Sequence, residues 1–240
     1  MEVLLSARRK DFMAALRVLM RKTLKPFFQR FLDIPRDHKE EIMRTFMQAL
    51  TWWNLPPGDY LEFGVYRGRS FIYAYKQAQQ FNLNMHFYAF DSFQGLPQVS
   101  GHDKKYSRLG QGDYSCDEES FKKILADNKV DLSAVTIIPG FYDLTLNEKT
   151  KEELDLKRAA IVWIDCDVYE STNPVLDFIT DYLTTGSIIA FDDWLLFCGN
   201  PNAGEMRAAR EWLEKNGHIR LVEYKPFGLF GQSFIVQIEE

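Results

Sequence analysis

Short apolar runs alternate with helical stretches along most of the chain. The candidate strands are YLEFGV, MHFYAFD, VTIIPG, AIVWID and SIIAFDD, at residues 60–65, 85–91, 135–140, 160–165 and 187–193. The candidate helices lie at 69–81, 117–128, 172–184 and 203–216. Nearly continuous apolar strands that are separated by helices predict a parallel sheet with helices on both faces.

Both ends of the chain depart from this alternation. At the C-terminus, IRLVEYKPF (219–227) and QSFIVQIE (232–239) flank a glycine-containing turn, which predicts an antiparallel hairpin. The N-terminal part is helical, and PPGD at 56–59 ends its second helix, expected over 37–55. We therefore predict an N-terminal helical extension over 1–55, serving as a lid or for dimerisation, and one α/β domain over 56–240. A mostly parallel sheet that ends in a hairpin resembles the Rossmann-like, seven-stranded sheet of class I methyltransferases.

The loop after the first candidate strand, GVYRGRS, predicts a cofactor site. Ligands bind outside the carboxyl ends of parallel strands, and the amides at a helix start favour an anion. Two glycines, Gly64 and Gly68, are too few for a dinucleotide pyrophosphate, but the carboxylate of S-adenosylmethionine (SAM) accepts a looser loop. Glu62 would accept from the methionine ammonium, or else is an acid paired at a strand end. The predicted contacts in this region are Glu62, Phe63, Gly64, Tyr66, Arg67 and Ser70.

Asp91 ends the second candidate strand. It lies 23 residues beyond Gly68, where an acid can accept from both ribose hydroxyls of an adenosine. The alternative is a helix cap or an exposed turn. Sites for NAD and for SAM both use such an acid, so Asp91 predicts an adenosine-containing ligand but does not distinguish between the two cofactors.

Paired acids stand at the ends of the fourth and fifth candidate strands: Asp165 and Asp167 at the fourth, Asp192 and Asp193 at the fifth. If these strands are neighbours, their carboxyl ends bring Asp165 and the Asp192–Asp193 pair to one place beside the SAM sulfur. So many carboxylates repel one another unless they are protonated or bind a cation, and all-oxygen ligands suit Mg²⁺ or Ca²⁺. Such an ion lowers the pKa of a bound hydroxyl. The alternative is that one acid caps the helix after each strand, which would fit Asp167 or Glu170.

Five motifs, LEFGVYRGRS, FDSFQGLP, PGFYDLTL, IDCDVYEST and FDDW, occur in the order and spacing of the macrocin and mycinamicin O-methyltransferase family. The resemblance covers roughly residues 58 to 235. It implies a SAM-dependent enzyme that methylates a sugar hydroxyl, with Mg²⁺ held by Asp165, Asp192 and Asp193, and with Glu62, Gly64 and Asp91 around SAM. Within the same motifs, we also expect cofactor contacts from Ser92, Gly140, Phe141 and Asp165. The N-terminal helices and residues 198–213 depart from the family pattern, so the acceptor is not carried over.

The candidate bases are His102, Asp165 and Asp193. His102 lies in the long polar segment SGHDKKYSRLGQGDYS (100–115), which is typical of an active-site lid. His86 and His218 fit structural positions better. With a metal lowering the pKa of the hydroxyl, a strand-end aspartate suffices as the base.

Composition and charge narrow the class of protein. A net charge of −5 argues against nucleic acid as a partner, and three cysteines without metal-site spacing indicate reduced thiols in a cytoplasmic protein. No apolar run is long enough for a membrane helix. Residues 1–30 carry a balance of +6, with eight Lys/Arg against two acids, and predict a basic amphipathic helix. It would pack on its own domain or on a second subunit of a homo-oligomer, or contact a membrane surface.

Three functions compete at this point. The leading one is a SAM-dependent, metal-assisted O-methyltransferase for a hydroxyl of a glycoside or similar polyol. A nicotinamide-dependent oxidoreductase is the second, although it requires a fuller glycine fingerprint. The third is a non-catalytic, SAM-binding partner protein, against which the crowded aspartates argue.

Overall fold

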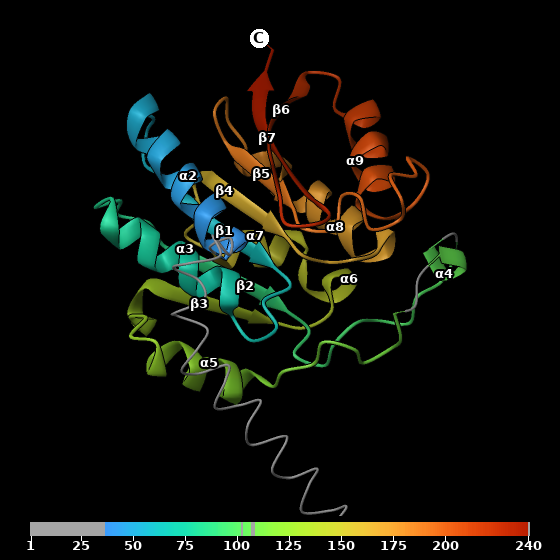
Figure 1. Ribbon diagram of the computed structural model, residues 1–240, viewed down its shortest axis with the longest axis horizontal. Helices are drawn as coiled ribbons and strands as arrows, with labels where there is room; N and C mark the ends of the chain where they lie inside the picture. Colours follow the sequence, from blue (N-terminus) through green and yellow to red (C-terminus); the bar gives the residue numbers. More distant parts are fainter. Residues whose placement is uncertain (1–36, 102, 107–108, 240) are drawn as a thin grey trace, which may run out of the picture. The chain divides into compact units, whose positions relative to one another are not determined.

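Seven strands form one mixed sheet in the order β3-β2-β1-β4-β5-β7-β6 (Figure 1). The computed structural model describes residues 37–101, 103–106 and 109–239. Five strands run parallel, and β7 is antiparallel to both β5 and β6. Their bounds are β1 Asp59–Phe63, β2 Phe87–Asp91, β3 Val135–Pro139, β4 Ala159–Ile164, β5 Ile188–Phe191, β6 Ile219–Phe227 and β7 Gly231–Ile238. The predicted class I methyltransferase architecture is confirmed, including the C-terminal hairpin.

Helices follow the strands as the alternating pattern predicts. The bounds are α2 His38–Trp53, α3 Arg69–Gln80, α4 Asp103–Tyr106, α5 Glu118–Asp127, α6 Tyr142–Thr145, α7 Glu148–Glu153, α8 Tyr169–Ile179 and α9 Gly204–Lys215, with short 3₁₀ turns η1 Leu132–Ala134 and η2 Thr180–Tyr182. The start of α8 differs from expectation, because it lies three residues before the predicted residue 172. The chain enters this helix directly from the loop that carries Asp165 and Asp167.

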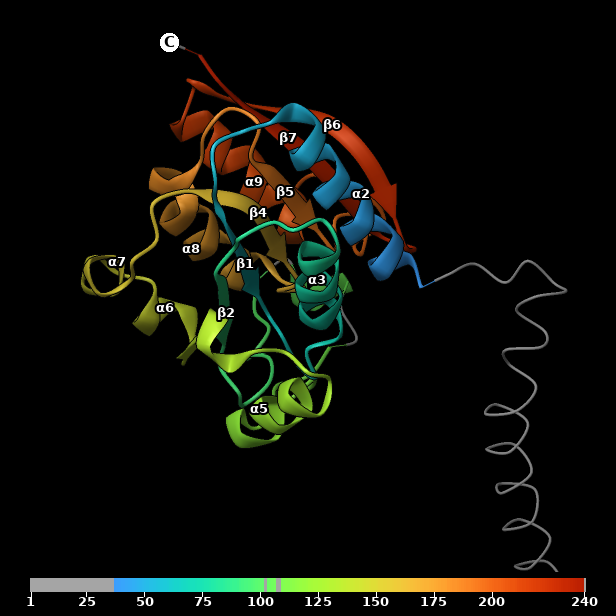
Figure 2. The same cartoon turned by 90° about the vertical axis from the view of Figure 1, so that its left-hand side faces the viewer.

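Alternating strand residues face two separate hydrophobic layers, as the period of a strand requires. One layer packs α2, α3 and α5 against strand residues such as Tyr60, Phe87 and Trp163. The other packs α8 and α9 against Phe63, Phe90 and their neighbours. Figure 2 shows α2 and α3 on one side of the sheet and α8 on the other. Since both faces are covered, the carboxyl ends of the parallel strands are the part of the sheet where a ligand binds.

The chain divides into two units, residues 1–38 and 39–240. The basic amphipathic helix that we predict within residues 1–30 lies outside the described residues, and so do its expected lid, subunit and membrane contacts. Met43, Phe46 and Met47 of α2 are fully buried in the core of the second unit, so this part of the predicted extension packs on the sheet.

Two further observations bear on the sequence predictions. All three cysteines are free thiols. Within the described part of the chain, we find no helix with the length and apolar character needed to cross a membrane.

Candidate functional site

The predicted site residues stand at the carboxyl ends of adjacent strands. Gly64, Asp165 and Asp192 are each the first residue after their strand, and each amide extends the parallel ladder by one hydrogen bond. The bonds run from Gly64 N to Phe90 O, from Asp165 N to Phe63 O and from Asp192 N to Ile164 O, all at 2.9 Å. The sheet therefore fixes the positions of these backbone atoms directly.

A cavity of about 650 Å³ lies along these strand ends. The order of the strands reverses between β1 and β4, where ligands of open α/β sheets bind. Seven of the predicted cofactor residues line the cavity: Gly64, Tyr66, Asp91, Ser92, Gly140, Phe141 and Asp165. Loop residues Leu96, Pro97, Gln98, Gln111 and Tyr114 form another part of the wall.

Asp91 organises the glycine loop. Its Oδ2 accepts from the amides of Val65 at 2.8 Å and Tyr66 at 3.1 Å, and its Oδ1 accepts from the amide of Phe93 at 2.7 Å. Burial raises the pKa of Asp91, and these three bonds counteract it. A carboxylate has about four acceptor sites, so this one keeps capacity for a ligand hydroxyl. Asp91 thus both shapes the loop and lines the cavity.

Asp91→Ala is expected to weaken SAM binding by about 100-fold or more. The loss combines ribose hydrogen bonds to a charged acceptor, on the order of 1.5–3 kcal/mol each, with the loosening of the loop. Calorimetric titration of the folded variant with SAM and S-adenosylhomocysteine measures this. An affinity equal to that of the parent protein would remove Asp91 from the cofactor site.

Glu62 is fully buried and does not line the cavity. Its Oε1 accepts from Ser70 Oγ at 2.6 Å, and its Oε2 accepts from the hydroxyl of Tyr60. Burial raises its pKa to about 8, although both hydrogen bonds lower it. The acid is therefore mostly protonated at neutral pH. Phe63, Arg67 and Ser70 also lie off the cavity wall, and their contacts with the cofactor, like that of Glu62, stay predictions.

Glu62→Gln is expected to make stability less sensitive to pH. Because the pKa of Glu62 is raised in the folded state, its contribution is fully present below the unfolded value near 4.5 and is lost as the pH rises towards about 8. The variant should therefore gain stability relative to the parent between pH 5 and 8.5, by roughly 2 kcal/mol or more. Urea denaturation of both proteins across this range measures the difference, and parallel curves would contradict the raised pKa.

Three aspartates converge beside the cavity. Carboxylate oxygens of Asp165, Asp167 and Asp193 all lie within 4.8 Å of one another. Asp167 has a left-handed backbone, with φ +60°, in the loop between β4 and α8. Burial and the charge of Asp165 raise its pKa to about 7, and burial and Asp167 hold the pKa of Asp193 well above its usual range.

These three residues fit a hard divalent cation. The donors are all carboxylate oxygens, they are close enough to share one ion, and positive charge would relieve their repulsion. The set differs from the one that the sequence suggests, since Asp167 joins it. Asp192 Oδ2 instead forms an ion pair with Lys39 Nζ at 2.8 Å. Whether Asp192 also binds a metal stays a prediction.

Glu205 supports this cluster from the start of α9. It is 1% exposed, and its Oε2 accepts from the amide of Asp193 at 3.0 Å. Its Oε1 has no hydrogen-bond partner among the described residues. The pKa of Glu205 lies well above its usual range, mainly because the side chain is buried and also because Asp193 is near. A buried acid therefore fixes the backbone of a candidate ligand.

The polar segment after β2 is fastened to the loops that carry the aspartates. Asp103 is 1% exposed, and its carboxylate accepts from Tyr169 N at 2.7 Å and from Gly204 N at 3.0 Å. Asp103, and neither Asp167 nor Glu170, therefore satisfies the amide at the start of α8. Ser100 Oγ donates to Glu170 Oε1 at 2.8 Å. His102 lies outside the described residues, so its contact with the acceptor stays a prediction.

The sequence patterns do not predict four residues at or next to the candidate site: Lys39, Asp103, Asp167 as a ligand, and Glu205. For Glu205 the signal is its spacing, since Glu205, Ala208, Ala209 and Trp212 recur on one buried face of α9. For Lys39 it is the position four residues before the buried Met43 on α2. The capping role of Asp103 has no local sequence signal, because its partners lie 66 and 101 residues away.

Comparison with known structures identifies the same fold in several methyltransferases. The O-methyltransferase NovP has a TM-score of 0.68 at 22% identity, over 82% of this chain and 79% of NovP. The calicheamicin methyltransferase CalS11 has a TM-score of 0.70 at 23% identity, over 95% and 92%, and is also described as a TDP-rhamnose 3′-O-methyltransferase. An O-methyltransferase from Bacillus cereus, in complex with S-adenosylhomocysteine, has a TM-score of 0.53 at 11% identity, over 88% and 96%. At these identities the likeness establishes the fold.

The sequence itself gives the family. Among curated proteins, none is similar enough to the chain to count as a relative. The family model described as macrocin O-methyltransferase (TylF) matches residues 40–218, which is more than half of the chain and includes the strand ends, the glycine loop and the aspartate cluster. The protein is thus a SAM-dependent O-methyltransferase, and it belongs to the macrocin O-methyltransferase (TylF) family.

Proposed function

We propose that this enzyme methylates a hydroxyl of a sugar, glycoside or similar polyol with the help of a divalent cation such as Mg²⁺. The observation that carries the proposal is the arrangement of one cavity. Asp91 and the glycine loop line one part of it, and the aspartates of β4 and β5 line another. An adenosine site and an oxygen-rich cation site therefore open into the same space.

The chain's residues around SAM bind and orient the cofactor, which supplies an already activated methyl group. Gly64 and Gly140 lie in the cavity wall, where small residues leave room for the ligand. Asp91 accepts from the ribose, while Tyr66, Ser92 and Phe141 enclose the cofactor. Their main effect is alignment, since fixing the acceptor oxygen, methyl carbon and sulfur in line accounts for much of the barrier reduction in such a transfer.

In this proposal Asp165, Asp167 and Asp193 hold the cation, and Asp192 is a further candidate. A bound divalent cation lowers the pKa of a hydroxyl and stabilises its negative charge. An aspartate of the cluster, Asp165 or Asp193, accepts the proton of the acceptor hydroxyl. His102 remains a further candidate for that contact.

The acceptor class rests on other residues that line the same cavity. Gln98, Gln111 and Tyr114 offer amide and hydroxyl groups, and Glu170 offers a carboxylate. Amide, hydroxyl and carboxylate groups suit a hydroxyl-rich molecule. That CalS11 is described as acting on a sugar nucleotide agrees with this class.

Incubation of the purified protein with labelled SAM and a panel of glycosides, nucleoside diphosphate sugars and phenols, with and without Mg²⁺, tests the proposal. We expect label on a hydroxylated glycoside, located by mass spectrometry. Label on phenols alone would contradict the acceptor class. SAM binding without transfer to any member of the panel would favour a non-catalytic partner protein, and tight binding of NADH alone would favour an oxidoreductase.

A further inference from the structure

Asp103 is a buried carboxylate that the starts of two helices share. Its Oδ2 accepts from the amide of Tyr169 at 2.7 Å, and its Oδ1 accepts from the amide of Gly204 at 3.0 Å. Tyr169 is the first residue of α8, and Gly204 is the first residue of α9. The unpaired amides and the dipole at a helix start both stabilise an anion. One side chain therefore joins α4 to α8 and to α9.

In the described part of the chain, neither α8 nor α9 receives a cap from its own N-cap residue. These residues are Val168 and Ala203, which offer no side-chain acceptor, and both have an extended backbone. Serine, threonine, aspartate or asparagine is usual at this position, because its side chain satisfies an amide of the first turn. The two helices instead share an acceptor that lies 66 and 101 residues away in the sequence.

Each of the three joined segments contributes to the cavity. The loops that lead into α8 and α9 carry the strand-end aspartates, which line it. Residues 97–101, 103–106 and 109–111, here called the Asp103 segment, contribute Gln98 and Gln111. The base of this segment is closed by two hydrogen bonds of 2.9 Å, from Leu96 N to Asp113 O and from Gly112 N to Leu96 O. Beyond this base, the bonds of Asp103 connect it to both aspartate loops.

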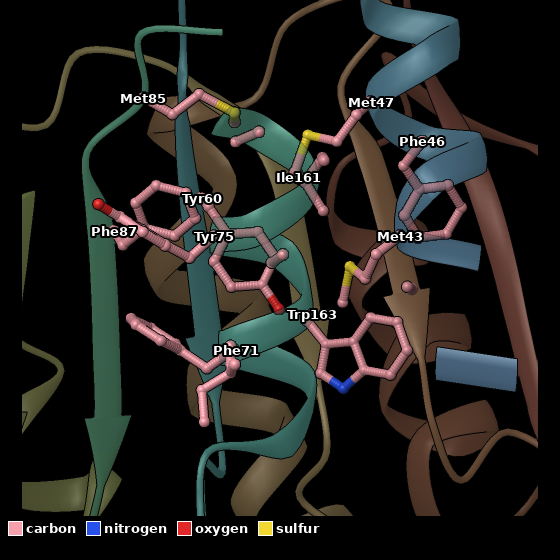
Figure 3. Packing of buried hydrophobic residues seen from close by; sticks show 14 of the residues in the cluster. Met43, Phe46, Met47, Tyr60, Phe71, Tyr75, Met85, Phe87, Ile161 and Trp163 are labelled. Carbon is pink, nitrogen blue, oxygen red and sulfur yellow. The ribbon is translucent and has the colours of Figure 1, made fainter. Parts of the chain in front are cut away.

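A small apolar cluster lies at the same junction. Its buried residues are Val99, Val168, Phe197 and Ala203. No described residue of the Asp103 segment belongs to either of the two large hydrophobic layers. Figure 3 shows one of these layers, in which Met43 and Phe46 of α2 pack towards Trp163 of β4. The sheet and its layers should therefore stay folded when Asp103 is replaced, while the junction loosens.

We propose that Asp103 is a positioning residue for methyl transfer, which holds Gln98 and Gln111 at a fixed distance from the aspartates that follow β4 and β5. Asp103 is not among the described residues that line the cavity, so it acts through the backbone of the two loops. A misplacement of about 1 Å can lower the rate of an aligned reaction about 100-fold. The inference rests on the proposed function for the acceptor contacts of the two glutamines.

Kinetic measurements on the full chain test the inference, with SAM and whichever glycoside, nucleoside diphosphate sugar or phenol the parent protein methylates. Asp103→Ala should lower kcat/KM for the acceptor by about 30-fold or more, while the Kd of SAM changes by less than about threefold. Asp103→Asn should lose a similar factor, because a single carbonyl oxygen cannot accept from both amides in this geometry. It keeps the shape of the side chain, so it carries the test if Asp103→Ala does not fold. Unchanged kcat/KM in a folded variant would overturn the inference.

Asp117→Ala is the matched control. Asp117 caps α5 by accepting from the amide of Ser120 at 2.9 Å, and it does not belong to the described lining of the cavity. Its loss should lower the melting temperature but leave the acceptor kinetics and the Kd of SAM unchanged. An equal fall in kcat/KM in this control would assign the effect of Asp103 to a general loss of stability and contradict the proposal.

Local caps separate positioning from helix stability. Val168→Thr and Ala203→Ser, added to Asp103→Ala, place a hydroxyl at each N-cap position, where the extended backbone suits a cap. The melting temperature should rise towards that of the parent protein, but kcat/KM for the acceptor should stay low, because the Asp103 segment remains unattached. Recovery of kcat/KM would show that Asp103 is only a shared cap.

Hydrogen exchange decides the inference even if the parent protein methylates no acceptor of the panel. In Asp103→Ala, the amides of the Asp103 segment and of the first turns of α8 and α9 should exchange about tenfold faster than in the parent. With the local caps added, only the helix starts should recover. Unchanged exchange of the Asp103 segment in Asp103→Ala would refute the inference. Failure of transfer to glycosides alone touches only the proposed acceptor class.

Discussion

Gly64→Ala is expected to lower the free energy of unfolding by about 3 kcal/mol or more and to abolish measurable SAM binding. A Cβ at this position would lie 1.9 Å from the backbone oxygen of Asp165. The residue also has φ +88°, a conformation that side chains rarely adopt. Neither backbone segment can yield easily, because β1 and β4 are paired without a break from Tyr60–Ile161 to Phe63–Ile164 and their ladder continues through Asp165 N.

Gly112→Ala separates the two causes. Gly112 has φ +84°, almost the same backbone conformation, but nothing lies within 4 Å of an added Cβ. Gly112→Ala should lower the free energy of unfolding by only about 1 kcal/mol, because a positive φ strains an alanine. Urea denaturation of both variants gives the free energies, and calorimetry gives SAM affinity. Equal losses in the two variants would show that the close approach of β1 and β4 is not what requires a glycine at residue 64.

The parts of the site that the sequence predicts well are those fixed by single strands. A short apolar run that ends in an acid or a glycine predicts both the strand and the edge at which the residue stands. This is why Gly64, Asp91 and Asp165 line the cavity as expected. Parallel pairing leaves little freedom at the first residue after a strand, since its amide continues the ladder.

The parts that the sequence does not predict depend on packing between distant elements. Asp167 follows Asp165 by two residues, which in a continuing strand would place both on one face. It reaches the cluster instead through a left-handed backbone in the loop, a conformation that a single aspartate predicts only weakly. Asp192 forms an ion pair with Lys39, which lies 153 residues earlier in the sequence. The position of its side chain therefore depends on how α2 packs against β4.

The boundaries of helices and strands also differ in how well the sequence predicts them. The start of α8 at Tyr169 precedes the predicted residue 172, because the acceptor for the Tyr169 amide is Asp103 from a distant segment. Helices α4, α6 and α7 have four to six residues, too few for a hydrophobic period to show. The long helices and the strands carry whole periods of apolar residues, and most of their ends fall within about three residues of the prediction. The exception is the end of α8 at Ile179, where the prediction gives residue 184.

Removal of divalent cations is expected to reduce methyl transfer at least about 100-fold while SAM still binds. Most of the expected cofactor residues belong to β1, β2, β3 and the loops that follow them, whereas the cation ligands follow β4 and β5. The two functions should therefore separate, although Asp165 is expected at both sites. Asp193→Asn should act like the chelator, since it keeps the shape of the side chain but loses the charge that holds the ion. In the absence of metal this variant should also melt no lower than the parent protein, because one of several repelling carboxylates is gone.

The measurement compares initial rates and SAM affinity with Mg²⁺, with excess EDTA, and with EDTA followed by an excess of Mg²⁺. Asp181→Asn serves as the control, because Asp181 is an exposed carboxylate whose partner is Lys151, away from the cavity. It should keep the rate and the metal requirement of the parent. The rate should return when Mg²⁺ is restored to the parent and to Asp181→Asn, but not to Asp193→Asn. Full activity of the parent protein in excess EDTA would refute the cation and leave Asp165, Asp167 and Asp193 as hydrogen-bond acceptors and the base for the acceptor hydroxyl.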